Sequence, residues 1–556
     1  MPSSGLKFSD DLTAKLAAKM GDINLKQKEQ EAEAKAAGLG LPYINLYRFP
    51  ITVDAITLIP KEESTRLQAV CFLYAGEEIR MGAVDPSLPE IPELLHVLEE
   101  RHHAHGMLYL LSENSLKEAM KIYDALPSIK ERPKDVVINE ADLDRLSQAI
   151  GSFTELSKKI KEASTTDVLT MMLAAALKFN SSDVHVEAEE KRIVLRLRLD
   201  GILNEAADLS SDSWHKIISR IKLISGLKIN IEDKPQDGRF TIAIKGQKID
   251  VRVSTIPTSF GESVVMRILK PMANLNMEDL GFRGHAAEVL KGQVERSNGM
   301  IVTTGPTGSG KTTTLYSILQ KLNQPDVKII TLEDPVEYKL PGINQSQIDP
   351  SRDYTFAKGL RSILRQDPDI VMVGEIRDLE TAEVAIQAAL TGHLMLSTIH
   401  TNSAAGAVPR FLSMGVKPFL LAPSLNVVIG QRLVRKLCEK CKKEITLDEK
   451  TMTRTKEVLE KLPEAEKKRV DLNNLKFYTG GGCEACGGLG YKGRMGIYEV
   501  LEMNKEIEQM ILKNEMSVYV IEEVAIKNGM VTMAQDGVLK ALEGITSVDE
   551  VFRVAQ

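Results

Sequence analysis

The sequence predicts a mixed α/β protein built from several domains, and three observations support this fold class. The chain has 556 residues, which at roughly 100–200 residues per domain is enough for three or four domains with cores of their own. Its second half alternates apolar strand patterns with helical patterns, the order typical of a parallel sheet covered by helices. A glycine-rich loop motif in the same half follows a predicted strand and opens a predicted helix.

Charge and hydropathy exclude several other classes. The net charge of −6 and the pI near 6.0 disfavour a strongly basic nucleic-acid binder, since such domains usually have a pI above about 9. No stretch reaches the roughly 18 uninterrupted apolar residues of a membrane-spanning helix, and the start lacks the apolar segment of a secretory signal. Five cysteines in the whole chain exclude a disulfide framework. We therefore expect a cytoplasmic protein.

Changes in composition divide the chain into six segments. An Ala-, Lys- and Glu-rich start predicts one or two short exposed helices, and a later charged stretch with two prolines is typical of a linker. Further on, the helix pattern TTDVLTMMLAAALKFN precedes the strand patterns RIVLRLRLDG, RFTIAIKG and KIDVRVST. The predicted segments are a helical extension (1–40), a small α/β domain (41–126), a linker (127–145), a second α/β domain (146–270), a hinge (271–278) and a third α/β domain (279–556).

The most specific pattern is GPTGSGKT at residues 305–312, which fits GxxxxGK[ST] without a mismatch. In such a loop, glycines let backbone N–H groups turn towards phosphate oxygens at a helix N-terminus. Lys311 would then reach the β- and γ-phosphates of ATP and Thr312 would hold Mg²⁺, whereas a chance glycine-rich turn is the alternative. The residues expected to bind the nucleotide are Gly305, Pro306, Thr307, Gly308, Ser309, Gly310, Lys311, Thr312 and Thr313.

Two further predicted strands end in carboxylates, which a nucleotide site needs to organise its metal ion and the attacking water. The apolar run of VKIITLEDPVEY ends at Glu333, and that of DIVMVGEIRD ends at Glu375. Both are candidates because ligands bind at the carboxyl ends of strands in open α/β sheets, although either could be a helix cap or a surface acid. His393 and His400 flank the strand in TGHLMLSTIHTN, and His400 is the better candidate for a hydrogen bond to the γ-phosphate.

Four of the five cysteines form two Cys-x-x-Cys pairs, which predict a structural metal site. Cys438 with Cys441 and Cys483 with Cys486 can each present two thiolates, and together they complete a tetrahedral zinc site with no position open for water. The charged segment between the pairs would be a helical excursion held at its base, so residues 432–496 are expected to form a zinc subdomain. Disulfides, a redox-active pair and iron–sulfur coordination are the alternatives.

Taken together, these motifs resemble those of the secretion-ATPase superfamily that drives type II secretion and type IV pilus assembly. In that family GPTGSGKT is the Walker A loop, TLEDPVEY matches the aspartate box, RSILRQDPDIVMVGEIRDLET the Walker B region and TGHLMLSTIHTN the histidine box. Upstream, SSDVHVEAEEKRIVLRLRLDG, PQDGRF and VRVSTIPTSFGESVVMRIL resemble the domain that precedes the ATPase domain. The resemblance implies a RecA-like P-loop ATPase domain at 279–556, a PAS-like α/β domain before it, a small N-terminal α/β domain and a tetracysteine zinc element.

The resemblance also implies roles for individual residues. Glu375 would polarise the attacking water, and Glu333 would assist it through the metal or its waters. Arginines must neutralise charge on the phosphoryl oxygens, and in this family they would come from the second domain, often that of a neighbouring subunit. The candidates are Arg239 and Arg252, with Arg267 third. Exposed strand arginines that make only weak surface pairs are the alternative.

The implied function is a cytoplasmic motor ATPase that uses ATP, Mg²⁺ and a structural Zn²⁺ and forms a homohexameric ring. ATP would lie between the third domain of one subunit and the second domain of the next, and hydrolysis would change the angle between these domains about the hinge. The N-terminal domain would dock at the inner face of the cytoplasmic membrane. An inner-membrane platform protein would receive the motion and drive pilin subunits into a type IV pilus.

Other functions remain as alternatives. The first is a type II secretion ATPase that drives pseudopilus assembly and protein export. A RecA-like nucleic-acid motor would have a basic channel and hydrolysis stimulated by DNA, and no direct nucleic-acid partner is expected here. A scaffold that binds ATP without hydrolysing it is the third. Some members of the resembled family bind a cyclic dinucleotide at the N-terminal domain through a tandem Arg-Leu-Gly motif. This sequence lacks the motif, so such binding is not predicted.

Overall fold

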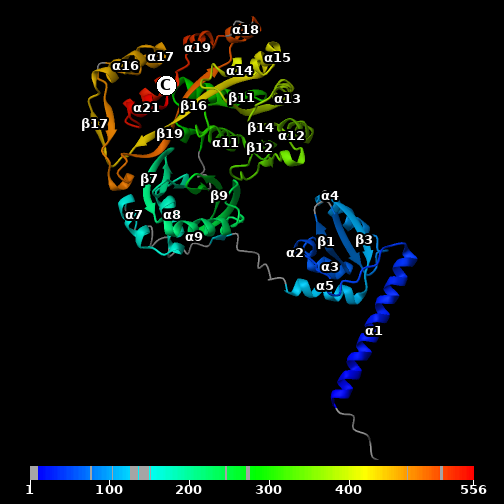
Figure 1. Ribbon diagram of the computed structural model, residues 1–556. Helices are drawn as coiled ribbons and strands as arrows, with labels where there is room; N and C mark the ends of the chain where they lie inside the picture. Colours follow the sequence, from blue (N-terminus) through cyan, green and yellow to red (C-terminus); the bar gives the residue numbers. More distant parts are fainter. Residues whose placement is uncertain are drawn as a thin grey trace, which may run out of the picture. The chain divides into compact units, whose positions relative to one another are not determined.

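The computed structural model describes residues 10–75, 78–102, 104–125, 135–136, 150, 152–244, 247–270, 276–472, 474–513 and 517–555. The predicted linker, apart from two residues, and most of the predicted hinge lie outside this range. The chain divides into two compact units, residues 1–133 and 134–556 (Figure 1). No helix in the described part combines the length and the apolar composition that crossing a bilayer requires.

The first unit contains a three-stranded sheet in the order β1-β2-β3, with short helices packed around it. The first two strands are antiparallel, and a helical crossover makes the third parallel to the second. Cys71 lies in the first strand and is fully buried, as expected for a small core residue. The elements are α2 (Val53–Ile56), α3 (Lys61–Leu67), β1 (Ala69–Ala75), β2 (Glu78–Ala83), α4 (Glu90–His102), β3 (His105–Leu110) and α5 (Glu113–Ala125).

A single helix of 30 residues, α1 (Asp10–Leu39), precedes this sheet, where the sequence predicted one or two short helices. Ala, Lys and Glu favour the helix strongly, and one glycine in its middle costs only about 1 kcal/mol relative to alanine. Its C-terminal half is anchored to the sheet domain. The hydroxyls of Ser112 (2.5 Å) and Tyr43 both donate to the carboxylate of Glu29, and Ala36 is buried.

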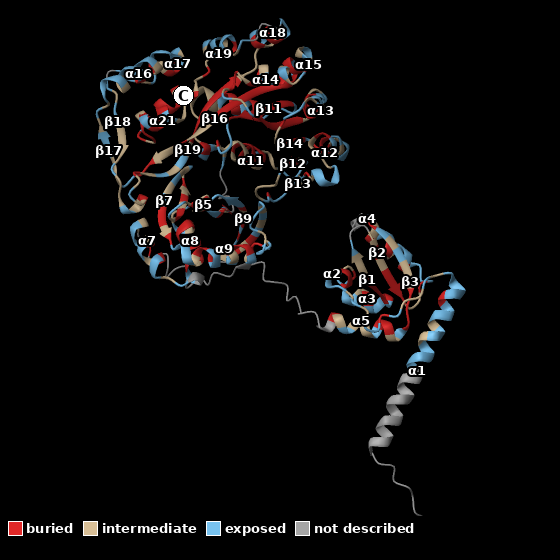
Figure 2. Cartoon of the chain, viewed as in Figure 1, coloured by how far each residue is buried: buried red, intermediate tan, exposed pale blue. Residues whose placement is uncertain are grey.

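The second unit begins with a seven-stranded sheet in the order β4-β8-β9-β10-β5-β6-β7, whose core lies between one face and three helices (Figures 1 and 2). The strand patterns seen in the sequence all form strands, because their alternation directs one set of apolar side chains towards the helices. The elements are β4 (Asp135–Val136), α7 (Phe153–Glu162), α8 (Thr165–Lys178), β5 (Asp183–Ala188), β6 (Ile193–Leu199), β7 (Ile202–Leu209), α9 (Ser211–Ile224), β8 (Gln236–Ile244), β9 (Gln247–Thr258) and β10 (Gly261–Leu269).

The third domain contains a second seven-stranded sheet, in the order β13-β12-β14-β15-β11-β16-β19, which is parallel except for β19 at one edge. Every residue of β11, β12, β14 and β15 is buried, which explains their continuous apolar runs in the sequence. The strands are β11 (Gly299–Thr304), β12 (Ile329–Glu333), β13 (Asn344–Gln347), β14 (Ile370–Val373), β15 (Leu394–Ile399), β16 (Leu425–Leu437) and β19 (Tyr491–Glu502).

Helices cover both faces of this sheet and form a separate apolar core on each (Figure 1). One core contains α10 and α11, and the other contains α12 to α15 with α18 and α19. The helices are α10 (Gly284–Val294), α11 (Lys311–Leu322), α12 (Phe356–Ile363), α13 (Leu379–Leu390), α14 (Ala407–Ser413), α15 (Pro418–Ser424), α18 (Lys505–Lys513) and α19 (Val518–Lys527).

The segment between the cysteine pairs leaves the sheet at the far end of the β16–β19 hairpin. It contains a two-stranded sheet of β17 (Lys442–Ile445) and β18 (Phe477–Gly480), with α16 (Glu449–Glu460) and α17 (Glu464–Lys467) between them. The predicted helical excursion is therefore present, but it has no core of its own. Its apolar side chains share one cluster with those of the C-terminal helices α20 (Met533–Leu542) and α21 (Val548–Val554).

Two loops of the third domain touch the second domain. After the last cysteine, Leu489 packs against the second-domain core, and the backbone N–H of Gly493 donates to the Asp200 carboxylate at 2.8 Å. From the other side, the guanidinium of Arg252 on β9 lies 3.6 Å from the carboxylate of Glu337. The cysteine loop and the loop after β12 therefore form contacts between these two domains.

A buried carboxylate fixes α21 to the hairpin. Glu550 is 2% exposed and accepts hydrogen bonds from the guanidinium groups of Arg435 (2.8 Å) and Arg553 (2.6 Å). Burial raises the pKa of this carboxyl, but the two arginines outweigh burial and lower it to about 2. Such a group stabilises the fold above its unfolded pKa, near 4.5, and loses this contribution as the pH falls towards the folded value.

The variant Glu550→Gln is therefore expected to reduce stability at pH 7 by about 3 kcal/mol, because the half-buried Arg435 and the exposed Arg553 lose their anionic acceptor. The difference from wild type should shrink as the pH falls below about 4.5, where the wild-type carboxylate begins to take up a proton. Thermal unfolding followed by circular dichroism between pH 7 and pH 3 measures this difference. A difference that does not change with pH would contradict the interpretation.

Candidate nucleotide site and metal centre

The phosphate loop, residues 305–310, joins β11 to α11 as the sequence predicts. Gly305 has a φ of 146°, and a Cβ there would lie 2.5 Å from the carbonyl oxygen of Gln431 and 2.7 Å from Oγ of Ser309, so only glycine fits. Gln431 also donates from Nε2 to the carbonyl of Ser309 at 2.8 Å. The loop is thereby held against β16, with the N-terminus of α11 directed at its interior.

Side chains of the loop suit an anionic ligand. The buried hydroxyl of Ser309 has no hydrogen-bond partner within the described ranges. Lys311 donates from Nζ to the carbonyls of Gly305 (2.7 Å) and Pro306 (3.1 Å), and burial lowers its pKa although Glu375 acts in the opposite direction. A phosphate would compensate the cost of burying this ammonium. Of the other predicted residues, Pro306, Thr307 and Gly308 are exposed, and Gly310, Thr312 and Thr313 are half-buried.

The structure brings Glu375 and His400 together beside this loop. Glu375 follows β14 with a side chain 13% exposed, and its carboxylate lies 2.5 Å from the guanidinium of Arg377 and 3.4 Å from Nε2 of His400. Neighbouring strands hold both residues, because Thr398 of β15 donates to the carbonyl of Gly374 at 2.9 Å. The order β14-β15-β11 places these strand ends next to the phosphate loop. Such a carboxylate can orient a water molecule towards a bound phosphate.

Glu333 lies at the end of β12 but points into the interior, where it is 3% exposed. Its carboxylate accepts hydrogen bonds from the hydroxyls of Tyr316 on α11 and Thr331 (2.5 Å) and from the amide of Gln345 (3.1 Å). Burial and the hydrogen bond to Glu333 raise the pKa of the Tyr316 hydroxyl well above its usual range. The structure therefore shows Glu333 hydrogen-bonded to Tyr316 of α11. Its assisting role in hydrolysis remains a prediction.

His393 is not brought to the site. It precedes β15, at the amino end of the parallel sheet, whereas the phosphate loop lies at the carboxyl end. Its Nδ1 lies 3.1 Å from the carbonyl oxygen of Ala388. This contact places the His393 ring against a backbone carbonyl near the end of α13. Of the two histidines, His400 is therefore the one near Glu375.

The three candidate arginines lie in one row across the second-domain sheet. Arg239 pairs with Arg252, Arg252 with Arg267, and Arg267 with Asp183 across four adjacent strands. Directly opposite residues of antiparallel strands project from the same face, so this row presents its charges together. The sequence identified each arginine, but only the strand register shows that they are neighbours.

The three arginines differ in the partners that they already have. Arg267 donates to Asp183 at 2.8 Å, and this bond lowers the pKa of Asp183 despite the opposing effect of burial. Arg252 is shared with the carboxylate of Glu337. Arg239 is exposed and makes no ion pair with any residue that the structure describes. It is therefore the arginine of the row that is most available to an outside anion.

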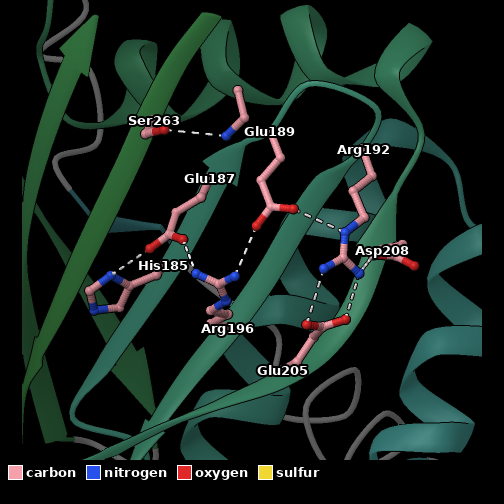
Figure 3. A network of polar contacts seen from close by, with 9 residues as sticks. His185, Glu187, Glu189, Arg192, Arg196, Glu205, Asp208 and Ser263 are labelled. Atoms are coloured by element: carbon pink, nitrogen blue, oxygen red, sulfur yellow. Dashed lines mark hydrogen bonds and ion pairs between the residues drawn. The ribbon is translucent and has the colours of Figure 1, made fainter. Parts of the chain in front are cut away.

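Arginines elsewhere on the same domain are paired with carboxylates, as Figure 3 shows. Arg192 lies 2.7 Å from a carboxylate oxygen of Glu205, and Arg196 lies 2.9 Å from one of Glu189. Asp208, Glu187 and His185 extend the network. These charges satisfy one another, and none of them was a candidate from the sequence.

Two residues near the phosphate loop had no signal in the sequence analysis. Gln431 holds the loop, and Arg432 extends one guanidinium nitrogen towards Gly305 and donates from the other to the carbonyl of Asn402 at 3.1 Å. Both follow the apolar run of β16, at the same sheet edge as Glu375. Polar residues directly after a predicted parallel strand are the signal that could have identified them.

The four predicted cysteines meet at one point, with sulfur atoms all within 4.8 Å of one another. Three of the contacts are 3.8 Å: Cys438 to Cys483, Cys441 to Cys486, and Cys483 to Cys486. Two sulfurs bound at about 2.3 Å to one tetrahedral zinc ion lie about 3.8 Å apart, so the donor set and its spacing fit Zn²⁺. The same distances are far too long for disulfide bonds.

Backbone groups favour the thiolate form of one cysteine, Cys486, whereas burial raises the pKa of Cys441. The N–H groups of Cys483 and Gly490 donate to the sulfur of Cys486, each at 3.2 Å. Burial raises the pKa of this thiol, but these donors outweigh burial and lower it to about 7. Such second-sphere N–H donors are typical of metal-binding cysteines. The ion would close the base of the excursion and hold the loop that carries Leu489.

Comparison with known proteins decides the family. The family model described as type II/IV secretion system protein matches residues 158–553, well over half of the chain. The chain belongs to this family. The resemblance predicted from the four motifs is thereby confirmed. The matched span contains strands β5 to β10 of the second domain and all but the last three residues of the third domain.

Relatives in this family carry both of the names that the sequence analysis anticipated. The chain is 38% identical over 527 residues to the type IV pilus assembly ATPase PilB of Thermus thermophilus, a match that covers 92% of this chain and 56% of that protein. It is 42% identical over 495 residues to the type II secretion system protein E of Klebsiella pneumoniae, covering 88% and 95%. The chain thus spans just over half the length of the Thermus relative and nearly all of the Klebsiella one.

A solved structure supports the fold. The X-ray structure of the Legionella pneumophila ATPase DotB aligns with a TM-score of 0.51 at 21% identity and covers 69% of this chain and 94% of that one. The predicted enzyme class, an ATPase of the secretion superfamily, agrees with the family and with these relatives.

Protein purified anaerobically is expected to contain one zinc ion per chain. Replacing Cys441 and Cys486 together by serine should remove the metal and lower the melting temperature, because structural zinc contributes folding free energy directly. Elemental analysis by mass spectrometry measures the zinc. A Cys71→Ala variant is the matched control and should keep the full zinc content, since this cysteine lies in the other unit. Absence of zinc from the wild type would refute the site.

Proposed function

We propose that this chain is a motor ATPase that couples ATP hydrolysis to the assembly of a type IV pilus. The observation that carries the proposal is the sheet edge at which the phosphate loop, Glu375 and His400 lie together in a member of the type II/IV secretion family. The Thermus thermophilus relative of that name, similar over 92% of this chain, supports the choice of pilus assembly.

In this proposal the phosphates of ATP bind within the loop of residues 305–310. Lys311 exchanges its two carbonyl partners for the β- and γ-phosphates, and Ser309 gains an acceptor or donor for its unpartnered hydroxyl. Thr312, at the first turn of α11, would hold Mg²⁺. When bound, Mg²⁺ neutralises negative charge that develops on the phosphoryl oxygens.

Glu375 is the residue that would polarise the attacking water. Arg377 and His400 contact its carboxylate and limit its rotation, so that one oxygen can accept a hydrogen bond from water. His400 is close enough to the same site to bond the γ-phosphate. Glu333 is proposed only as an assisting acid, because it must exchange its bond with Tyr316 for a water molecule before it can act.

Assembly into a homohexameric ring would complete the site. The second domain of one subunit would supply Arg239 to the ATP of its neighbour, since this arginine has no acidic partner among the residues described in its own chain. Hydrolysis would then change the angle between the second and third domains about residues 271–278. An inner-membrane platform protein would receive that motion at the cytoplasmic face of the membrane, where the N-terminal domain docks.

A type II secretion ATPase is the second candidate function. The Klebsiella pneumoniae type II secretion protein E, with 42% identity and alignment over 95% of its own length, favours it. Both functions use the same chemistry and differ in the filament that is assembled. Copurification of membrane proteins with residues 1–133, which form a compact unit, distinguishes the two partner sets.

Glu375→Gln is expected to bind ATP with nearly unchanged affinity and to lose almost all turnover, by at least about 10²-fold, because the amide cannot polarise water. Binding of a fluorescent ATP analogue and release of phosphate are the two measurements. Unchanged turnover would remove Glu375 from the mechanism. A chain that neither binds nor hydrolyses ATP would overturn the proposed function as a whole.

Arg239→Ala is expected to reduce hydrolysis by about 10³-fold without lowering the melting temperature, since the side chain makes no ion pair with the residues that the structure describes. Because the arginine acts on a neighbour, mixing this variant with inactive Lys311→Ala chains should restore part of the activity. In mixed rings some sites combine an intact Lys311 with an intact Arg239. A mixture as inactive as its components would contradict supply between subunits.

A further inference from the structure

Arg432 is a half-buried arginine at the edge of the phosphate loop. One of its terminal nitrogens lies 3.2 Å from the position that a Cβ of Gly305 would take. Within the described part of the chain its hydrogen bonds go to backbone carbonyls, those of Gln431 at 3.2 Å and Asn402 at 3.1 Å. Burial lowers its pKa, because the guanidinium has lost water, although the charge of Glu499 acts in the opposite direction.

The absence of an acidic partner distinguishes this arginine from its half-buried counterparts. Arg196, Arg283 and Arg435 each form an ion pair with a glutamate. Arg432 forms none with any residue in the described ranges. The acid that acts on it electrostatically, Glu499, is buried, has a raised pKa because of that burial, and already accepts the backbone N–H of Ala404 at 2.6 Å. No ion pair joins this carboxyl to the guanidinium, so Glu499 offsets the charge of Arg432 only in part.

The place of Arg432 indicates which phosphate it faces. Asn402, whose carbonyl it contacts, lies two residues after His400, and His400 lies 3.4 Å from Glu375. Gly305, on its other side, is the first residue of the phosphate loop. The guanidinium therefore lies between the loop and the residues proposed to orient the attacking water, the side of the site at which the terminal phosphate of ATP is expected.

We propose that Arg432 binds the γ-phosphate of ATP within its own subunit and thereby makes the site prefer ATP over ADP. This inference rests on the proposed ATPase function. The free N–H groups of the guanidinium can bond two phosphate oxygens at once. ADP lacks the terminal phosphate and leaves Arg432 with its carbonyl partners, so the residue contributes to ATP affinity and little to ADP affinity.

Competition with fluorescent mant-ADP, in the presence of Mg²⁺, tests the proposal on the full chain. A non-hydrolysable ATP analogue and ADP are titrated separately against wild type, Arg432→Gln, Arg432→Ala and Arg432→Lys. Gln keeps a donor for the carbonyl of Asn402 but has no charge. We expect it to weaken the ATP analogue about 10- to 100-fold and ADP less than about 2-fold, with partial recovery in Lys.

Two controls separate this role from a structural one. Arg192→Ala removes a cation from the second-domain network of Figure 3, remote in sequence from the phosphate loop, and should leave the ratio of ATP to ADP affinity unchanged. If Arg432 only ties the loop of Asn402 to β16, Gln should behave like wild type and Ala should weaken both nucleotides equally with a lower melting temperature. Either result overturns the proposal. Failure of wild type to bind mant-ADP would instead overturn the proposed ATPase function.

Discussion

Burial of the parallel sheet on both faces is the constraint on which the third domain depends. Because every residue of β11, β14 and β15 is inaccessible, charged groups can be placed without a large desolvation cost only beyond the strand ends. Glu375 and His400 follow this rule. Glu333 is an exception inside the sheet, and it is tolerated because three donors surround its carboxylate. The candidate nucleotide-binding and catalytic side chains therefore lie mainly along the edge formed by the carboxyl ends of the parallel strands.

Much of this edge could be predicted from the sequence, because its main residues directly follow apolar runs or lie within a motif of fixed spacing. The cysteine site was equally accessible, since paired spacing and thiolate chemistry suffice. Arg432 also follows an apolar run, but its contacts could not be predicted from that position. Its neighbours, Gly305 and Asn402, are distant in sequence, and they meet it only because β16 pairs with β11, which no local pattern specifies. The helical excursion between the cysteine pairs was predicted. Its packing was not, because its apolar side chains share one core with α20 and α21, which come later in the chain.

Ion pairing separates arginines that hold the second domain together from arginines that can serve elsewhere. Arg192 and Arg196 are surrounded by carboxylates of their own sheet, so their charges contribute to local order and exert little attraction on a distant anion. Arg267 is hydrogen-bonded to the buried Asp183, and Arg252 pairs with Glu337 in the loop after β12. Strand register places the three arginines in one row. They differ in how far acidic side chains of the same chain already engage them.

The strand β16 joins the nucleotide end of the third domain to its cysteine end in one continuous run of 13 residues. Side chains alternate along a strand, so Gln431 meets the phosphate loop and Arg435 meets Glu550 only if the number of residues between them is kept. Deleting or inserting one residue there would turn one of the two contacts to the wrong face. The spacing along this strand therefore couples the support of the phosphate loop to the attachment of the C-terminal helix.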